Sequence, residues 1–315
     1  MPSKMTEPRE IEVLLATYNG AKYIREFLES LLRQEGVKIH LRISDDGSTD
    51  DTIKICHEYS EKFNRITFQT GPKAGPAANF YSLLRSSSGE MIALADQDDL
   101  WQPNHLIDSI ARVELTPERP TLTYAKVREF NSESGLDQAK LWPRQVPKGD
   151  IREVLTWNPA RGCTIVLNRK AVEIINSHPP QKAIMHDWWA LLCIFAVGKV
   201  SCSTEAEIYY RLHETNTVGV PRSRSARIRN WFLNLKSSGW PILEQARELL
   251  EIHGSKMDLE TIANLSIWCD RLASRRWRDK LMAALFLGRY RADLIDEAIV
   301  RLTFLLLPMS RRFSR

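Results

Sequence analysis

The chain has 315 residues, of which 43% are hydrophobic and 26% are charged, a composition typical of a folded globular protein. Its net charge of +5 is too small to identify a nucleic-acid-binding protein. The sequence contains no run of about 18 apolar residues, so we expect no transmembrane helix. The polar residues 1–10 predict no secretory signal, and five scattered cysteines predict free thiols in a reducing compartment.

The first hundred residues alternate between strand and helix patterns. Short apolar or alternating segments predict four strands, at residues 11–16, 39–44, 66–69 and 91–95. Apolar residues at helical spacing follow each strand, the first of them at residues 24–32. Strands that alternate with helices are typical of a mostly parallel sheet with crossover helices, so we expect an α/β fold.

Polar clusters follow three of these strands. They are Thr17-Tyr18-Asn19, Asp45-Asp46-Gly47 and Asp96-Gln97-Asp98-Asp99. Parallel sheets bind ligands beyond the carboxyl ends of their strands, and we therefore expect the three clusters to converge on one edge of the sheet.

The third cluster places three carboxylates after an apolar strand. Like charges at Asp96, Asp98 and Asp99 repel one another, and a bound divalent cation relieves that repulsion. Oxygen ligands favour Mg²⁺ or Mn²⁺. The alternative is a solvated turn that caps the helix predicted after Pro103.

The second cluster supports two interpretations. Asp46 could accept hydrogen bonds from a nucleobase or ribose, or the following residues could simply cap the next helix. The glycine-rich fingerprints of dinucleotide-binding and P-loop proteins are absent from the sequence, and no organic cofactor is predicted.

The middle of the chain is less regular. Strands are predicted at residues 121–130, 163–168, 199–203 and 207–213, with a polar loop over residues 131–148. Helices are predicted from Arg169 and over residues 188–197.

Two pairs of residues in this region could carry chemistry. Asp187 opens a helix and could be a general base or only a cap, and the adjacent Trp188 and Trp189 could line an acceptor site or the core. Arg211 and His213 alternate along a strand, so they would share a face and could clamp a diphosphate, or they could be structural.

These motifs together resemble glycosyltransferase family 2. The resemblance rests on residues 16–20, 44–50 and 94–101, in that order and at that spacing. Residues 161–164, 186–189 and 210–216 are similar to the bacterial rhamnosyltransferase-type branch. The similarity covers about residues 10–220 and implies the GT-A fold, an inverting mechanism and a nucleotide-sugar donor.

The resemblance also implies roles for individual residues. Thr17 and Asp46 would bind the nucleotide, and Tyr18, Asn19, Arg211 and His213 are further candidates for the donor site. Asp96 would contact the ribose and metal region, Asp98 would ligate the metal, and Asp187 would be the catalytic base. His186 stands where many members carry an acid, and Glu214 where related sequences often have a glycine.

The function so implied is sugar transfer to a hydroxyl of a glycan or lipid-linked acceptor in bacterial surface polysaccharide synthesis, with rhamnose as one candidate sugar. One alternative is a catalytically inactive GT-A-fold protein that only binds nucleotide or sugar. Another is a sugar nucleotidyltransferase, which the loop Thr17–Gly20 disfavours because it lacks a glycine-rich stretch with Arg or Lys.

The charge distribution predicts two regions, residues 1–221 and residues 222–315. The first carries 26 basic and 29 acidic side chains, whereas the second carries 18 basic and 10 acidic ones. The second region reads as helical, and its basic residues could contact an anionic membrane or only water. We expect a cytoplasmic protein with peripheral contact at the inner membrane, and no nucleic-acid partner.

Overall fold

A computed structural model describes residues 7–131, 135–143, 146–147, 149–213, 241–285, 290 and 294–306. The chain divides into two compact units. Unit 1 comprises Met1–Pro143, Ala160–Pro179 and Met185–His213, and unit 2 comprises Arg144–Pro159, Pro180–Ile184 and Glu214–Arg315. The boundary expected at residue 221 lies outside the described residues and stays a prediction.

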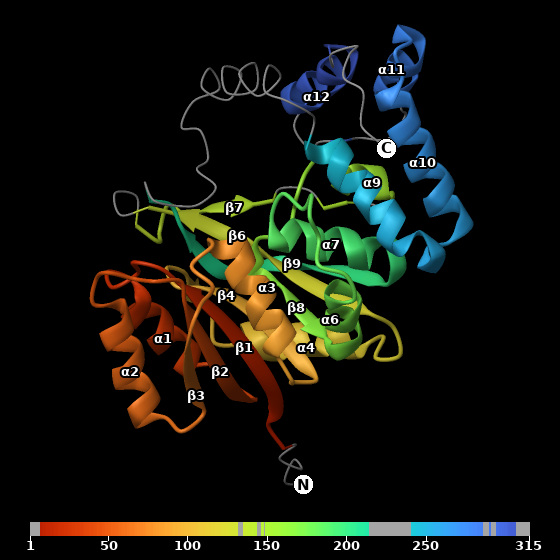
Figure 1. Cartoon of the computed structure of the whole chain (residues 1–315). Helices are drawn as coiled ribbons and strands as arrows, with labels where there is room; N and C mark the ends of the chain where they lie inside the picture. Colours follow the sequence, from red (N-terminus) through yellow and green to blue (C-terminus); the bar gives the residue numbers. More distant parts are fainter. Residues whose placement is uncertain are drawn as a thin grey trace, which may run out of the picture. The chain divides into compact units, whose positions relative to one another are not determined.

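The first half of unit 1 confirms the predicted α/β pattern (Figure 1). Four strands pair in parallel in the order β3-β2-β1-β4, and their bounds are β1 Arg9–Thr17, β2 Val37–Asp45, β3 Ile66–Thr70 and β4 Met91–Asp96. The connecting helices are α1 Ile24–Leu32, α2 Thr52–Lys62 and α3 Pro76–Ser86. Helix α1 forms as its apolar spacing predicts, because that spacing buries Phe27, Leu28 and Leu31 on one face.

The second half of unit 1 makes the sheet mixed. It adds the strands β5 Leu100–Trp101, β6 Thr121–Phe130, β7 Lys140–Trp142, β8 Val166–Asn168 and β9 Lys199–Arg211. Strand β8 pairs antiparallel with β4 and β6, β6 pairs parallel with β9, and β5 and β7 pair antiparallel with β9 and β6. The helices here are α4 His105–Glu114, α6 Arg169–Asn176 and α7 His186–Val197.

Three predicted segments differ from the structure. Residues 163–168 begin as a 3-10 turn, Gly162–Thr164, because the amides of Thr164 and Ile165 bond back to the carbonyls three residues earlier. The two strands predicted at residues 199–203 and 207–213 form one strand, β9, which pairs with β6 through register shifts. The predicted loop 131–148 contains the short strand β7.

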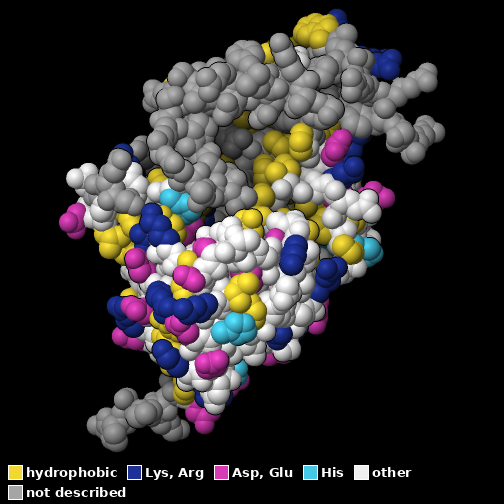
Figure 2. Space-filling model, turned by 60° about the vertical axis from the view of Figure 1, so that its left-hand side comes forward, with side chains coloured by type: hydrophobic (Ala, Val, Ile, Leu, Met, Phe, Trp, Pro, Cys, Tyr) yellow, Lys and Arg dark blue, Asp and Glu magenta, His cyan; other side chains and the backbone are white. Residues whose placement is uncertain are grey.

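The core of unit 1 lies between the sheet and its helices. Ile11, Val13 and Leu15 of β1 are buried against Phe27 and Leu31 of α1. On the visible face of this unit, basic and acidic side chains are interspersed rather than segregated (Figure 2). All five cysteines are free thiols, as predicted.

Unit 2 is helical within its described residues. Its elements are α5 Ile151–Leu155, α9 Pro241–His253, the 3-10 turn Gly254–Lys256, α10 Leu259–Ala273, α11 Trp277–Ala284 and α12 Leu294–Leu306. Asp258 begins α10 by accepting a hydrogen bond from the Thr261 amide at 2.8 Å. Among the described residues, none of the helices has the length and apolar character needed to cross a membrane.

Much of the predicted basic tail falls outside the described residues. This applies to its first and last arginine clusters, Arg222, Arg224, Arg227, Arg229, Arg311, Arg312 and Arg315, and to Glu214. The middle cluster, Arg275, Arg276 and Arg278, is described and exposed.

Candidate functional site

The predicted polar clusters meet at one edge of the sheet. Thr17 at the end of β1 pairs with Asp45 at the end of β2, and Ala16 pairs with Asp96 at the end of β4. The convergence expected from parallel strands is therefore confirmed.

Asp45 organises the turn after β2. One carboxylate oxygen accepts the amides of Gly47 and Ser48 at 3.0 and 2.7 Å. The other accepts the hydroxyls of Thr17 and Ser48 at 2.8 and 2.6 Å. Thr17 is 2% exposed, so its side chain ties β1 to β2, and its predicted donor contact stays a prediction.

The loop after β1 has a fixed shape. Asn19 has a φ of 47°, its amide donates to the Ser48 hydroxyl at 2.8 Å, and its side-chain oxygen accepts the Thr49 amide at 2.8 Å. Gln97 holds the backbone of Tyr18 by bonds of 3.0 and 2.9 Å, which leaves the Tyr18 side chain 57% exposed. An exposed aromatic ring on a rigid loop is suited to stack on a nucleobase.

Asp46 connects this turn to the loop before α3. Its two oxygens accept the amides of Lys73 and Gly75, each at 2.7 Å. Gly75 has a φ of 86°, which favours glycine at that position. Asp46 therefore shapes the loop Gly71–Pro76 and lies half-buried at the edge of the predicted donor site.

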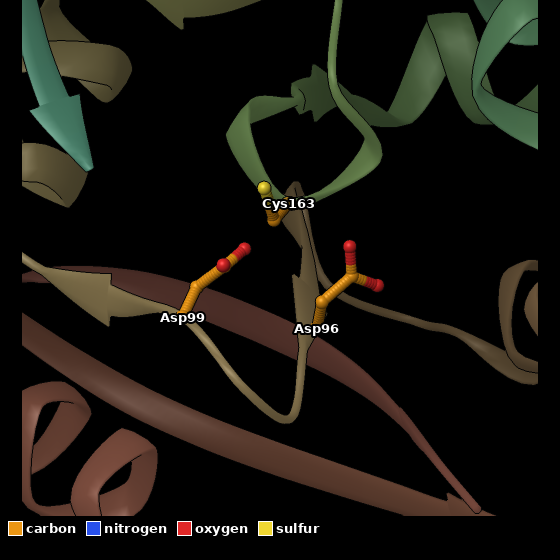
Figure 3. Close-up of side chains that lie close together, drawn as sticks. All are labelled: Asp96, Asp99 and Cys163. Atoms are coloured by element: carbon orange, nitrogen blue, oxygen red, sulfur yellow. The ribbon is translucent and has the colours of Figure 1, made fainter. Parts of the chain in front are cut away.

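Three side chains converge behind the end of β4 (Figure 3). The carboxylates of Asp96 and Asp99 and the thiol of Cys163 each place one ligand atom within 4.8 Å of the others. Asp96 is half-buried, whereas Asp99 and Cys163 are fully buried. Asp98 lies between the two acids in sequence and contacts His213, with 2.6 Å between Oδ2 and Nε2.

The electrostatics of this cluster fit a cation. Burial, and then the charges of Asp98 and Asp187, raise the pKa of Asp96 to about 8, with Arg161 opposing them. Burial, and then the charges of Asp98 and Asp96, raise the pKa of Asp99 well above its usual value. Helix α4 begins at Asn104 without a side-chain cap, so these acids are not its cap. A set of crowded oxygen donors is what a hard divalent cation binds.

The charge of Asp187 contributes to the raised pKa of Asp96, so Asp187 lies beside this cluster. It occupies the first turn of α7, whose cap residue is Met185, and one of its oxygens accepts the Trp188 amide at 2.7 Å. A Cβ at Gly162 would lie 3.6 Å from the Asp187 Cβ and 3.1 Å from His186 Nε2. The turn at Gly162 therefore packs directly against the start of α7.

His186 is buried next to the candidate base. Its ring stacks on Phe80 with centroids 4.0 Å apart, and neither ring nitrogen has a hydrogen-bond partner. Burial lowers the pKa of the imidazole, against the opposing charge of Asp187. A neutral ring at this place adds no charge to an already acidic site.

The two tryptophans of α7, Trp188 and Trp189, differ in their exposure. Trp189 is fully buried and belongs to the core, which was the alternative to its predicted acceptor role. Trp188 is half-buried, and it is the one of the pair that is accessible beside Asp187.

Arg211 and His213 both reach the turn after β4. The Arg211 side chain donates to the Asp98 carbonyl at 2.9 Å and to Glu26 at 2.7 Å. His213 stacks on Tyr23 with centroids 5.1 Å apart, and the Arg211 guanidinium lies 4.8 Å from the centre of the same ring. They share a face, as the alternation predicts, and they position the turn after β4.

Arg161 is a functional candidate that the motif reasoning left without a role. Its guanidinium bonds to Glu129 at 2.6 Å and lies 4.3 and 4.4 Å from the rings of Trp142 and Tyr210. It is also the cation that opposes the rise in the pKa of Asp96. The motif at residues 161–164 includes Arg161 but assigns it no role, since its partners are distant in sequence.

Comparison with known proteins agrees with this geometry. Residues 12–173 match the family model described as glycosyl transferase family 2. The dTDP-rhamnosyl transferase RfbG of Shigella flexneri is 27% identical over 243 residues, which cover 72% of this chain and 80% of the relative.

Two solved structures share the fold. The S. aureus TarS 1–349 structure in complex with UDP-GlcNAc has a TM-score of 0.53 at 19% identity and covers 87% of this chain and 84% of that one. The mannosyltransferase PcManGT from Pyrobaculum calidifontis, in complex with GDP-Man and Mn²⁺, has a TM-score of 0.50 at 15% identity. It covers 96% of this chain and 84% of that chain.

Proposed function

Because the chain belongs to glycosyl transferase family 2, and is thus a glycosyltransferase of the GT-A fold, we propose that it is an inverting, metal-dependent enzyme. It moves a sugar from a nucleotide-diphosphate donor to a hydroxyl of a glycan or lipid-linked acceptor. The observation that carries this proposal is the gathering of Asp96, Asp98 and Asp187, in which burial and then the charges of the other two raise the pKa of Asp96.

Asp98 and Asp96 would hold the divalent cation, Mg²⁺ or Mn²⁺. Their crowding fits such an ion, since burial and two nearby negative charges raise the pKa of the Asp96 carboxyl, which a cation would keep ionised. The Mn²⁺ in the mannosyltransferase structure supports this choice. When bound, the cation would neutralise charge on the diphosphate and help it to leave.

Asp187 would take the proton of the acceptor hydroxyl. Its place in the first turn of α7, beside Asp96, puts a carboxylate next to the proposed donor site. The acceptor oxygen would attack the anomeric carbon from the face opposite the diphosphate, which inverts the configuration there. Trp188, the neighbour of the base, would line the acceptor side.

The donor would lie along the edge formed by the ends of β1, β2 and β4. Tyr18 offers an exposed ring, and Asn19 belongs to the loop that carries it. Asp46 holds the loop Gly71–Pro76, which would border the nucleobase of the donor. Thr17 supports this edge from beneath through Asp45. Arg211 and His213 would act on the diphosphate side through the turn that they hold.

Rhamnose is a candidate sugar because the relative from Shigella flexneri is named as a dTDP-rhamnosyl transferase. The same likeness supports a place in bacterial surface polysaccharide synthesis. A lipid-linked acceptor would locate the reaction at a membrane, and we include peripheral contact with an anionic membrane at the cytoplasmic face in the proposal. The proposed domain division is residues 1–221 for transfer and 222–315 for the helical region.

A donor screen tests this function. Purified protein with Mn²⁺ is mixed with dTDP-, UDP- and GDP-sugars and lipid-linked acceptors, and mass spectrometry follows the products. We expect one donor to give an acceptor heavier by one sugar residue, with release of the nucleoside diphosphate. Donor binding without transfer or hydrolysis across the screen would instead identify a catalytically inactive binding protein.

A further inference from the structure

Helix α12 exposes an apolar face. Its outward side chains follow helical spacing over the whole length of the helix and include no charged residue; they are Leu294, Ile295, Ala298, Leu302, Leu305 and Leu306. Leu294 is 68% exposed and Leu302 is 51% exposed. An apolar stripe of this length on a surface marks a site of contact with another apolar phase.

The buried face of the same helix carries polar groups. Glu297 and Thr303 are buried next to Val300 and Phe304. The Glu297 carboxylate accepts the Tyr290 amide at 2.8 Å and the Arg301 side chain at 2.7 Å. A helix that faces water carries polar side chains on its outward face. The outward face of α12 is therefore not adapted to water.

The neighbouring helix α11 adds aromatic and basic groups. It packs against α12, and Trp277 at its start is 63% exposed. Three exposed arginines flank this ring, Arg275, Arg276 and Arg278, and the Arg278 guanidinium lies 5.9 Å from the ring centre. Met282 and Leu285 continue the apolar surface along α11. Hydrophobic and basic side chains lie beside one another at the top of Figure 2.

We propose that α11 and α12 form a surface that docks on an anionic lipid bilayer. The apolar side chains enter the boundary between headgroups and acyl chains, and the three arginines pair with headgroup phosphates. A tryptophan beside arginines suits this boundary, where basic side chains are attracted to anionic headgroups. Helix α12 has 13 residues, or about 20 Å, and so lies in the interface rather than across it.

Charge favours a membrane over a second copy of the chain. A second copy would bring its own three arginines to the contact, whereas anionic headgroups neutralise those of the first. This surface would supply the membrane contact included in the proposed function. Vesicle binding is measured without any transfer reaction, so failure of this proposal and failure of the transferase proposal are distinguishable.

Flotation with vesicles tests the surface. The full chain is mixed with phosphatidylglycerol/phosphatidylcholine vesicles or with pure phosphatidylcholine vesicles, at low and high salt. We expect binding to the anionic vesicles that weakens with salt. The double variant Leu302→Glu/Leu305→Glu should bind at least tenfold more weakly, and Arg275→Gln/Arg276→Gln/Arg278→Gln should lose most of the salt dependence.

A matched control separates this face from general surface hydrophobicity. Leu259 is 85% exposed at the start of α10, and Leu259→Glu should bind vesicles as the wild type does. Transfer to a water-soluble acceptor should be unchanged in all three variants. Quenching of tryptophan fluorescence by brominated lipid should decrease in Trp277→Phe.

Three outcomes would overturn the proposal. One is equal binding to neutral and anionic vesicles, or no binding to either. Another is undiminished binding by Leu302→Glu/Leu305→Glu with its helix content intact by circular dichroism. The third is a dimer in light scattering that the same double variant dissociates, which would assign the face to a second copy of the chain.

Discussion

Asp96 has a pKa of about 8, far above its usual 3.8. Burial is the main cause, and the neighbouring charges of Asp98 and Asp187 add to it. In the metal-free protein this carboxyl can ionise at neutral pH only at a cost in stability. A side chain kept under such a cost is typical of a functional site.

The pH dependence follows from the direction of this shift. Because the pKa of Asp96 is higher in the folded than in the unfolded state, ionisation of this carboxyl opposes folding. The neutral form of Asp96 contributes its full share of stability below about pH 4, and this share is lost as the pH rises toward about 8. A bound cation would reverse the loss by stabilising the ionised form.

We predict that Asp96→Asn is more stable than the wild type in chelator at pH 8.5, by about 1–3 kcal/mol, with a smaller difference at pH 5. The asparagine amide is neutral, so the variant has no negative charge at this buried and acidic position. Urea unfolding at the two pH values, with and without Mn²⁺, measures the effect. Mn²⁺ should stabilise the wild type but not the variant.

The exposed Asp51 provides the control, since Asp51→Asn should leave both the stability and the Mn²⁺ response unchanged. If Asp96→Asn were no more stable than the wild type at pH 8.5, the charge crowding at this site would be refuted.

Some of the site can be predicted from residues alone, and some cannot. Asp96, Asp98 and Asp187 follow landmarks that a sequence displays, namely the end of an apolar strand and the start of a helix. Arg161 has no such landmark, because Glu129 and Tyr210 reach it only through the pairing of β6 with β9.

At the scale of elements, the end of β9 supports the turn after β4. The Arg211 amide donates to Asp99 at 3.0 Å, while its side chain reaches the Asp98 carbonyl and Glu26. The guanidinium thus joins β9, α1 and the acidic turn in one network. A lysine has neither the planar fork nor the reach to make these bonds together.

We predict that Arg211→Lys lowers the free energy of unfolding by about 1–3 kcal/mol and lowers kcat/KM for the donor about tenfold. Both effects arise because the turn that carries Asp98 loses its support. Chemical unfolding measures the first effect and the rate of transfer at varied donor concentration the second. Arg33→Lys, at the exposed residue that follows α1, is the matched control. Weaker donor binding at undiminished stability would show instead that Arg211 acts only by contacting the donor.

The elements that sequence reasoning missed are those made by distant pairing. Strand β5 has two residues, too few for any periodic pattern, and exists because Leu100 and Trp101 pair with Tyr209 and Ile208 of β9. Strand β9 reads as two strands because polar residues interrupt it where its register with β6 shifts.

In the whole molecule, each compact unit is built from segments that are separated in the sequence. Unit 2 includes residues 180–184, since the amides of Gln181 and Lys182 donate to Glu248 at 2.6 and 2.8 Å. The change in charge along the sequence indicates a second region but carries no information about such contacts. The first four strands were predictable because local patterns and parallel pairing agree there.

Asp187 is the proposed base of a sugar transfer at the carboxylate site. Its direct test is the rate of transfer by Asp187→Asn together with donor affinity by calorimetry, with Asp108→Asn in the first turn of α4 as the control. We predict a loss of about 10²–10⁴-fold in transfer with donor affinity nearly unchanged. Full transfer by Asp187→Asn would contradict the account.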